Sequence, residues 1–443
     1  MISASSGVVS NIDYSTLISQ LVGIKRESIT QLETEKSVLK TAKSAYSNLS
    51  TRIKELITAS DALKTGSAFS VFKTNTSDNP YFKASANATA AAGSYEITVN
   101  SLAKAHRMAA DGVASDTTVV GTAAGSFSFQ VGAGEIKSVT VDTTTTLAGL
   151  RDSINALKAG VTAHIANDAP GSYRLVLTSG TTGTGGTVNV TQNDTSLVFS
   201  TTLQAAQDAS VTMDGMTYTR QTNSIGDMIG GVTLDLESAD TLKTSTLTVS
   251  RDTESIEKKV KAFIDGYNAV VTHIKLNNRY DSETKKGGPF FGDSVARSIW
   301  DDLRRVMSSA VSGLPDTMNR LMHAGIKVGD DGLYSLDSSK FSSALSTNYD
   351  DVVNLFTKGT TVSGFGELVH AAASSIDDMV DGRIKGRQDG IDKNIKRLDE
   401  DIRKKEAQLV TYEDQIRAQF TGLETMIASL NHQSAALMSL YGG

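Results

Sequence analysis

The C-terminal end of the chain carries apolar side chains at every seventh position, which is the pattern of a coiled coil. The repeat consists of Ile395, Ile402, Leu409, Ile416, Leu423, Leu430 and Leu437. The segment 391–421 contains no glycine and no proline. A heptad repeat keeps one narrow stripe of a helix against a partner helix. The pattern therefore predicts a long helix over residues 391–440 that packs on another helix.

A second apolar repeat near the N-terminus predicts the partner, a helix over residues 14–65 that Asp13 caps. Each helix would be about 75 Å long. Two helices of similar length from opposite chain ends predict an antiparallel pair with both termini at one tip. We expect residues 39–63 to face residues 395–423. The expected seam consists of Leu39, Tyr46, Leu49, Ile53, Leu56, Ile395, Ile402, Leu409, Ile416 and Leu423.

The apolar period falls to two between residues 69 and 250, where Thr, Ser, Gly, Ala and Val dominate. Asp214-Gly215 between two alternating segments is a strong hairpin signal. A second hairpin is expected between residues 161–166 and 173–178, after a short helix near Leu147. Helical spacing resumes from Ile256 onward. The pattern predicts an α+β, multidomain fold in which long antiparallel terminal coiled-coil helices and a helical domain are interrupted by a β-rich two-domain insert.

These patterns divide the chain into four expected domains. They are residues 1–38 with 400–443 as terminal coiled coil and mobile leg tips, 39–76 with 251–399 as a helical leg domain, 77–113 with 201–250 as an inner β domain, and 114–200 as an outer β domain.

Charge is absent from both ends of the chain, although the shaft of the C-terminal helix is rich in charge. Residues 1–12 and 425–443 carry no Asp, Glu, Lys or Arg. An uncharged, amphipathic helix end is poorly suited to standing alone in water, so we interpret it as a docking surface. The expected partner-docking tip consists of Leu17, Leu21, Ile427, Leu430, Leu437 and Leu440.

Composition and motifs argue against an enzyme. The net charge is −6, with no basic tract, and there is no cysteine. The six histidines lie far apart with no metal-ligand spacing, and we expect each at the surface or a boundary. No serine-nucleophile motif occurs in a plausible context. We therefore expect no catalytic site, metal, cofactor, nucleic-acid partner or membrane insertion. The first residues lack a secretory signal pattern, so export would need a dedicated machine.

Several motifs together resemble the family of flagellar filament cap proteins, also called flagellar hook-associated protein 2 (FliD). The opening segment 6–21 is similar to that family's start, with its glycine-rich run shortened to Gly7. Residues 146–163 are similar to the insertion motif shared by flagellins and hook-associated proteins. Further matching segments are Phe263–Asn268, Gly292–Trp300, Leu336–Lys340 and Tyr412–Asn431.

The resemblance implies a secreted structural protein at the distal tip of the bacterial flagellum, where it promotes folding and insertion of exported flagellin during filament elongation. It implies a ring-shaped homo-oligomer, a pentamer or a hexamer, whose helical legs contact filament subunits. Further implied partners are flagellin, hook-associated junction proteins and a cytoplasmic FliT-type export chaperone for the apolar tail.

Other functions remain open at this point. A sister axial protein, either flagellin or a hook–filament junction protein, also surrounds a β insert with terminal helices. A surface adhesin with a coiled-coil stalk would share the Thr/Ser-rich β domains, and cell adhesion could also be a secondary role of a cap. A hydrolase acting on peptidoglycan or protein is the remaining alternative.

Overall fold

The computed structural model describes residues 13–77, 81–357, 359 and 363–441, and it shows the expected α+β, multidomain fold. The chain divides into two compact units. The helical unit consists of Met1–Phe69 with Ile256–Gly443, and the β unit consists of Ser70–Ser255. The boundary falls between Phe69 and Ser70, whereas residues 39–76 had been expected together in the helical leg domain. The finer four-domain division stays a prediction.

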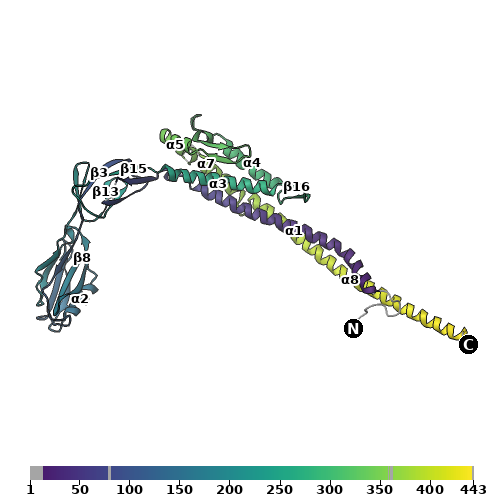
Figure 1. Ribbon diagram of the computed structural model, residues 1–443, viewed down its shortest axis with the longest axis horizontal. Helices are drawn as coiled ribbons and strands as arrows, with labels where there is room; N and C mark the ends of the chain where they lie inside the picture. The colour runs from purple at the N-terminus through teal and green to yellow at the C-terminus, as the bar shows by residue number, and fades with distance from the viewer. Residues whose placement is uncertain (1–12, 78–80, 358, 360–362, 442–443) are drawn as a thin grey trace. The chain divides into compact units, whose positions relative to one another are not determined.

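Long helices from both ends of the chain form the frame of the helical unit (Figure 1). Its elements are α1 (Tyr14–Asp61), η1 (Gly66–Ala68), α3 (Thr253–Asn277), β16 (Tyr280–Asp281), β17 (Lys286–Gly287), α4 (Ser294–Ser308), η3 (Leu321–Ala324), β18 (Ile326–Val328), β19 (Tyr334–Leu336), α5 (Ser338–Thr347), α6 (Tyr349–Phe356), α7 (Phe365–Ile376) and α8 (Arg383–Tyr441). One hydrophobic core joins α1, α3, α4, α7 and the first turns of α8.

The start of α1 is as predicted. The Asp13 carboxylate accepts a hydrogen bond from the Thr16 backbone N–H at 3.1 Å, which satisfies one donor of the first turn. Hydrogen bonds from the Thr16 and Ser15 hydroxyls, together with that N–H, lower the pKa of Asp13 to about 2. The cap is therefore charged at neutral pH.

The start of α8 differs from the prediction. The helix begins at Arg383 rather than Ile391, and it continues through Gly386 and Gly390. Glycine lowers helix propensity by about 1 kcal/mol, which is why a later start was expected. Burial of Ile384 and Ile391 in the helical core outweighs that cost.

The β unit is built from antiparallel strand pairs only, within the part of the chain that the structure describes. Its elements are β1 (Phe72–Thr76), β2 (Phe82–Ala86), β3 (Gly93–Ser101), β4 (Ala105–Ala109), β5 (Gly125–Val131), β6 (Lys137–Val141), α2 (Leu147–Ala156), β7 (Val161–Ala169), β8 (Ser172–Thr182), η2 (Thr184–Gly186), β9 (Val188–Asn193), β10 (Thr201–Gln204), β11 (Ala209–Met213), β12 (Met216–Arg220), β13 (Ser224–Ile229), β14 (Val232–Leu236) and β15 (Ser245–Arg251).

Two separate hydrophobic cores lie inside the β unit. The first joins the sheet β1-β15-β3-β11-β12 with the sheet β13-β14-β2. The second joins the sheet β10-β4-β8-β7, the sheet β6-β5-β9 and the helix α2. The first core is built from residues 82–103 and 209–249, and the second from residues 110–197. The expected inner and outer β domains would each contain one of these cores, and that division stays a prediction.

Both predicted hairpins of the β unit are present. Strands β11 and β12 pair across Asp214 and Gly215, whose φ angles are 49° and 82°. Positive φ at both central residues matches the twist of a two-residue hairpin. Strands β7 and β8 pair as predicted, with Val161 opposite Ser179.

Candidate functional site

The paired part of α1 and α8, which we call the leg, is held in register by contacts between their side chains. Lys43 Nζ lies 2.6 Å from a carboxylate oxygen of Asp392, and Lys36 pairs with Asp399. A step of seven residues toward the start of α1 is thus matched by a step of seven toward the end of α8. The two helices are antiparallel (Figure 1).

Aromatic contacts continue the leg toward the N-terminus. Lys25 Nζ lies 5.6 Å from the ring centroid of Tyr412, which is cation–π geometry. The rings of Tyr14 and Phe420 lie 4.8 Å apart, and the Tyr14 hydroxyl donates to Glu424 at 3.1 Å. The leg therefore extends along α8 as far as about Glu424.

The register differs from the one that the two repeats predicted. The two ion pairs place Leu39 opposite the part of α8 around Ile395. The seam residues of α8 that follow Ile395 therefore lie opposite the first half of α1. The segment 39–63 was expected opposite 395–423. The ion pairs and the earlier start of α8 place most of that segment against other helices instead.

The expected seam residues therefore fall into two groups. Tyr46, Leu49, Ile53 and Leu56 are fully buried in the core of the helical unit with α3, α4 and α7. Leu39 and Ile395 pack at the edge of that core. The other expected seam residues belong to the leg. Ile402 is buried, Leu409 and Ile416 are half-buried, and Leu423 is exposed.

An electrostatic joint connects α1, α4 and α8 at the base of the leg. Asp293 caps α4 by accepting from the backbone N–H of Val295 at 2.8 Å, and it accepts from Arg387 Nε at 2.9 Å. Burial alone would raise the pKa of Asp293. The Tyr46 hydroxyl, the Val295 N–H and the Arg387 charge outweigh burial and hold that pKa below its usual range. Burial and the Asp293 carboxylate raise the pKa of Tyr46.

Beyond the leg, α8 continues alone among the described residues (Figure 1). We call its end, residues 425–441, the tip. Leu430, Leu437 and Met438 are exposed there, and Ile427 is half-buried. A shallow groove of about 420 Å³ runs along the side chains of Leu430, Gln433, Ser434, Leu437 and Met438.

Three residues that were expected at the tip do not contribute to the described groove. Leu17 and Leu21 are exposed on the first turns of α1, beside the end of the leg. The side chain of Leu440 and all of residues 1–12 lie outside the described residues. That these residues dock a partner stays a prediction.

The structure describes little that resembles a chemical site. Among the described residues there is no group of His, Asp and Glu that could hold a metal ion. Every described helix is too short or too polar to span a bilayer. His106 was expected near the surface, but it is buried and its Nδ1 accepts from the Val188 N–H at 3.1 Å. Burial lowers the pKa of His106, so this histidine acts as a neutral hydrogen-bond partner within a β core.

The register residues were missed at the level of sequence. Lys36 and Lys43 are seven residues apart, as are Asp392 and Asp399. Charged residues that repeat every seven positions beside an apolar seam are a signal for which stretches of two helices pair. That signal was present, but the charge of the C-terminal helix was used above only to contrast its shaft with its uncharged end.

Comparisons with known proteins agree with this architecture. The family model for the C-terminus of flagellar hook-associated protein 2 matches residues 206–432, and the N-terminal model of the same protein matches residues 10–106. The flagellin hook IN motif matches residues 126–181, which lie in the second core of the β unit.

Curated relatives match along almost the whole chain. The flagellar hook-associated protein 2 of Aeromonas caviae is 30% identical over 98% of each chain. The protein of the same name from Escherichia coli K12 is 29% identical over 98% of this chain and 97% of its own. The crystal structure of the D1-D2-D3 domains of the flagellar cap protein FliD from Escherichia coli superposes with a TM-score of 0.64 at 26% identity, covering 79% of this chain and 99% of that one. The chain therefore belongs to the flagellar hook-associated protein 2 family.

Proposed function

We propose that this flagellar cap protein supports filament elongation at the distal tip of the bacterial flagellum by contacting filament subunits through the tip of α8, and that it promotes folding and insertion of exported flagellin there. Family membership supports the cap role over the alternatives that the sequence left open, which were a sister axial protein, an adhesin and a hydrolase. Absence of catalytic activity stays a prediction.

One observation carries the proposed contact. The leg ends near Glu424, yet α8 continues to Tyr441 with no charged side chain and with Leu430, Leu437 and Met438 open to water. A helix that exposes a continuous apolar stripe gains free energy when another protein covers it, at about 25 cal/mol per Å² of apolar surface. A contact made by only a few apolar side chains can dissociate quickly, so the cap could release it each time a flagellin subunit is added.

The same tip supports two finer proposals. Before export, an exposed apolar helix end needs protection, and a cytoplasmic chaperone of the FliT type would supply it. After export, the tip would meet flagellin or the hook-associated junction proteins. The cap itself would be a closed ring of identical copies, a pentamer or a hexamer. A head-to-tail contact between identical copies gives such a ring when the rotation from copy to copy returns to the start.

The test replaces the apolar side chains of the tip while keeping the helix. A triple variant, Leu430→Gln, Leu437→Gln and Met438→Gln, should be exported and folded, as circular dichroism would show, but should yield short filaments and poor swimming. A matched variant, Ile24→Gln with Val410→Gln, removes exposed apolar side chains from the leg and should leave filaments at normal length. Normal filaments from the tip variant would refute the proposed contact.

A further inference from the structure

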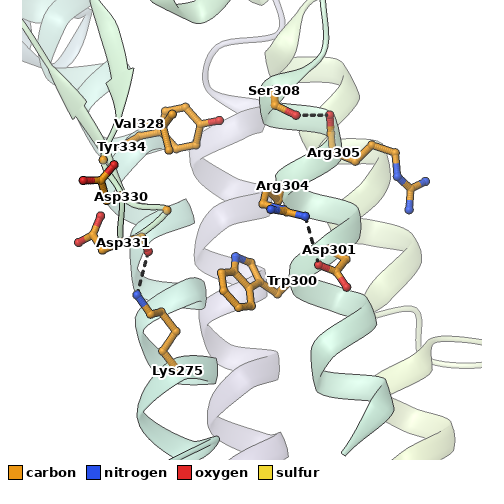
Figure 2. Close-up of a pocket in the computed structure, with 12 residues that line it drawn as sticks. Lys275, Trp300, Asp301, Arg304, Arg305, Ser308, Val328, Asp330, Asp331 and Tyr334 are labelled. Carbon is orange, nitrogen blue, oxygen red and sulfur yellow. Dashed lines mark hydrogen bonds and ion pairs between the residues drawn. The ribbon is translucent and has the colours of Figure 1, made fainter.

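A pocket of about 660 Å³ lies between α3, α4 and the β18–β19 hairpin of the helical unit (Figure 2). Trp300 and Arg304 of α4 line it on one side, and Val328 and Tyr334 of the hairpin line it on the other. Lys275 of α3 closes one end, where its Nζ donates to the Asp331 backbone oxygen at 2.8 Å. Nothing in the leg or the tip involves this pocket.

Polar groups of the hairpin and of α4 face the pocket. Tyr334 is only 7% exposed, its backbone N–H and C=O bond to the Asn268 side chain, and its ring borders the pocket. The indole N–H of Trp300 is buried and faces the Tyr267 hydroxyl, without reaching full hydrogen-bond geometry. The exposed guanidinium of Arg304 has only a loose ion pair, 3.8 Å from Asp301. Figure 2 shows these three side chains around one space. Asp301, Asp330 and Asp331 also line the pocket, but the guanidinium of Arg304 is only loosely paired. A loosely paired guanidinium beside an indole suits a carboxylate that arrives together with an apolar side chain.

A surface with the complementary chemistry lies on the turn between α7 and α8. Met379 and Val380 are 84% and 81% exposed, and the Asp381 carboxylate next to them has no partner among the described residues. The turn is fixed rather than loose, because the Asp378 carboxylate accepts from the backbone N–H groups of Val380 and Asp381 at 2.8 and 2.9 Å. A Cβ on Gly382 would lie 2.2 Å from the Asp378 backbone oxygen, so only glycine fits there.

The pocket and the turn lie on opposite sides of α4, so one copy cannot insert its own turn into its own pocket. Arg383, directly after the turn, pairs with Asp302 at 2.7 Å and donates to Ser298 Oγ at 3.1 Å. Asp302 is two residues from both Trp300 and Arg304. Two residues correspond to a rotation of about 200° around a helix axis. A turn 378–381 that enters this pocket would therefore come from a second molecule.

We propose that the turn 378–381 of one copy inserts into the pocket of a second copy of this chain, with Met379 against Trp300 and Val328 and with Asp381 paired to Arg304. This contact joins two different surfaces of the same chain, so it is heterologous, and a heterologous contact can repeat from copy to copy until a ring closes. The inference rests on the proposed ring-forming cap, and it assigns two surfaces through which neighbouring copies bind.

Disulfide crosslinking tests this contact directly, because the chain has no cysteine. In the full chain, Val328→Cys combined with Met379→Cys should give a ladder of crosslinked multimers under mild oxidation, and reductant should reverse it. Matched controls combine Val38→Cys, which is 60% exposed on α1, with either partner and should give no crosslinked multimers on a denaturing gel. Dimers formed by Met379→Cys alone would show a symmetric contact and overturn the proposal.

A charge reversal gives a second, independent test. Arg304→Glu should weaken self-association about tenfold or more, measured by native mass spectrometry over a concentration series. Asp381→Arg in the same chain should restore self-association, because the arginine at position 381 of one copy then pairs with the glutamate at position 304 of the next. Trp300 is the only tryptophan, so its fluorescence should become shielded from acrylamide as copies assemble.

The outcomes separate this inference from the proposed function. If rings form and filaments grow while the cysteine pair stays uncrosslinked and Arg304→Glu has no effect, the assigned surfaces are wrong and the cap function stands. If the unmodified chain forms no rings and supports no filament, the proposed function fails as well.

Discussion

A Cβ atom placed on Gly266 of α3 would lie 3.3 Å from the Cα atom of Leu56 on α1. The two helices therefore pack almost backbone to backbone at this point, in the centre of the helical core. We expect Gly266→Leu to lower the free energy of unfolding of the helical unit by about 1–3 kcal/mol, because an added side chain has no space there. Urea unfolding followed by Trp300 fluorescence measures the change.

The control for that variant is Gly23→Ala on α1. A Cβ on Gly23 meets no atom within 4 Å, so only helix propensity changes. This variant should be neutral or more stable by up to about 1 kcal/mol. Equal stability of the two variants would mean that the approach of α3 to α1 is not tight.

The ion pair between Lys43 and Asp392 should set the register of the leg. Both side chains are partly exposed, so the pair contributes only about 0.2–1 kcal/mol. Lys43→Asp or Asp392→Lys alone should weaken the leg by placing like charges opposite each other. The double exchange should recover most of the loss, and a double-mutant cycle on thermal unfolding measures the recovery. Additive single effects would show that the two residues do not meet.

Acid should weaken the joint at Asp293. Its folded-state pKa lies below its usual range, whereas the unfolded value is about 3.9. Its contribution to stability is therefore complete above the unfolded pKa and is lost as pH falls through the folded pKa. Asp293→Asn should cost about 1–3 kcal/mol at neutral pH. The difference from the unmodified chain should shrink below about pH 4, as urea titrations at several pH values would show.

A matched variant for this prediction is Asp389→Asn, which removes a carboxylate on α8 whose partner is Lys385 within the same exposed helix face. It should change stability by only a few tenths of a kcal/mol. A constant difference between Asp293→Asn and the unmodified chain down to strongly acidic pH would contradict the assigned pKa.

The middle of the leg can be opened by one charge. Leu409 is half-buried against α1, so Leu409→Lys should speed hydrogen exchange in the first half of α1 and in α8 around the substitution while leaving the β unit unchanged. Val410, the next residue, is 61% exposed. Val410→Lys should leave exchange as it is, since it adds the same charge on the solvent side.

Local signals in the sequence predicted local features correctly. Asp13 caps α1, and the Asp214-Gly215 turn joins β11 to β12. Each of these depends on residues within a few positions, where backbone donors and turn geometry decide the outcome. The fold class followed from the change of apolar period along the chain.

Features that depend on distant parts of the chain were predicted less well. The heptad repeats identified both helices of the leg, but an apolar stripe looks the same at every register. The ion pair of Lys36 with Asp399 selects one register. The second half of α1 packs in the core around Tyr46 and so pairs little with α8. The pocket at Trp300 could not be predicted, because its walls come from three elements that are adjacent only after folding.

The contact between Lys43 and Asp392 spans 349 positions of sequence. Contacts of such long separation form late, because a long loop must close before they add any stability. A chain truncated before α8 would contain α1 without its partner helix. The apolar stripe of α1 would then be exposed to proteases. The apolar stripes of the two leg helices are therefore buried only once α8 has been made and has packed on α1.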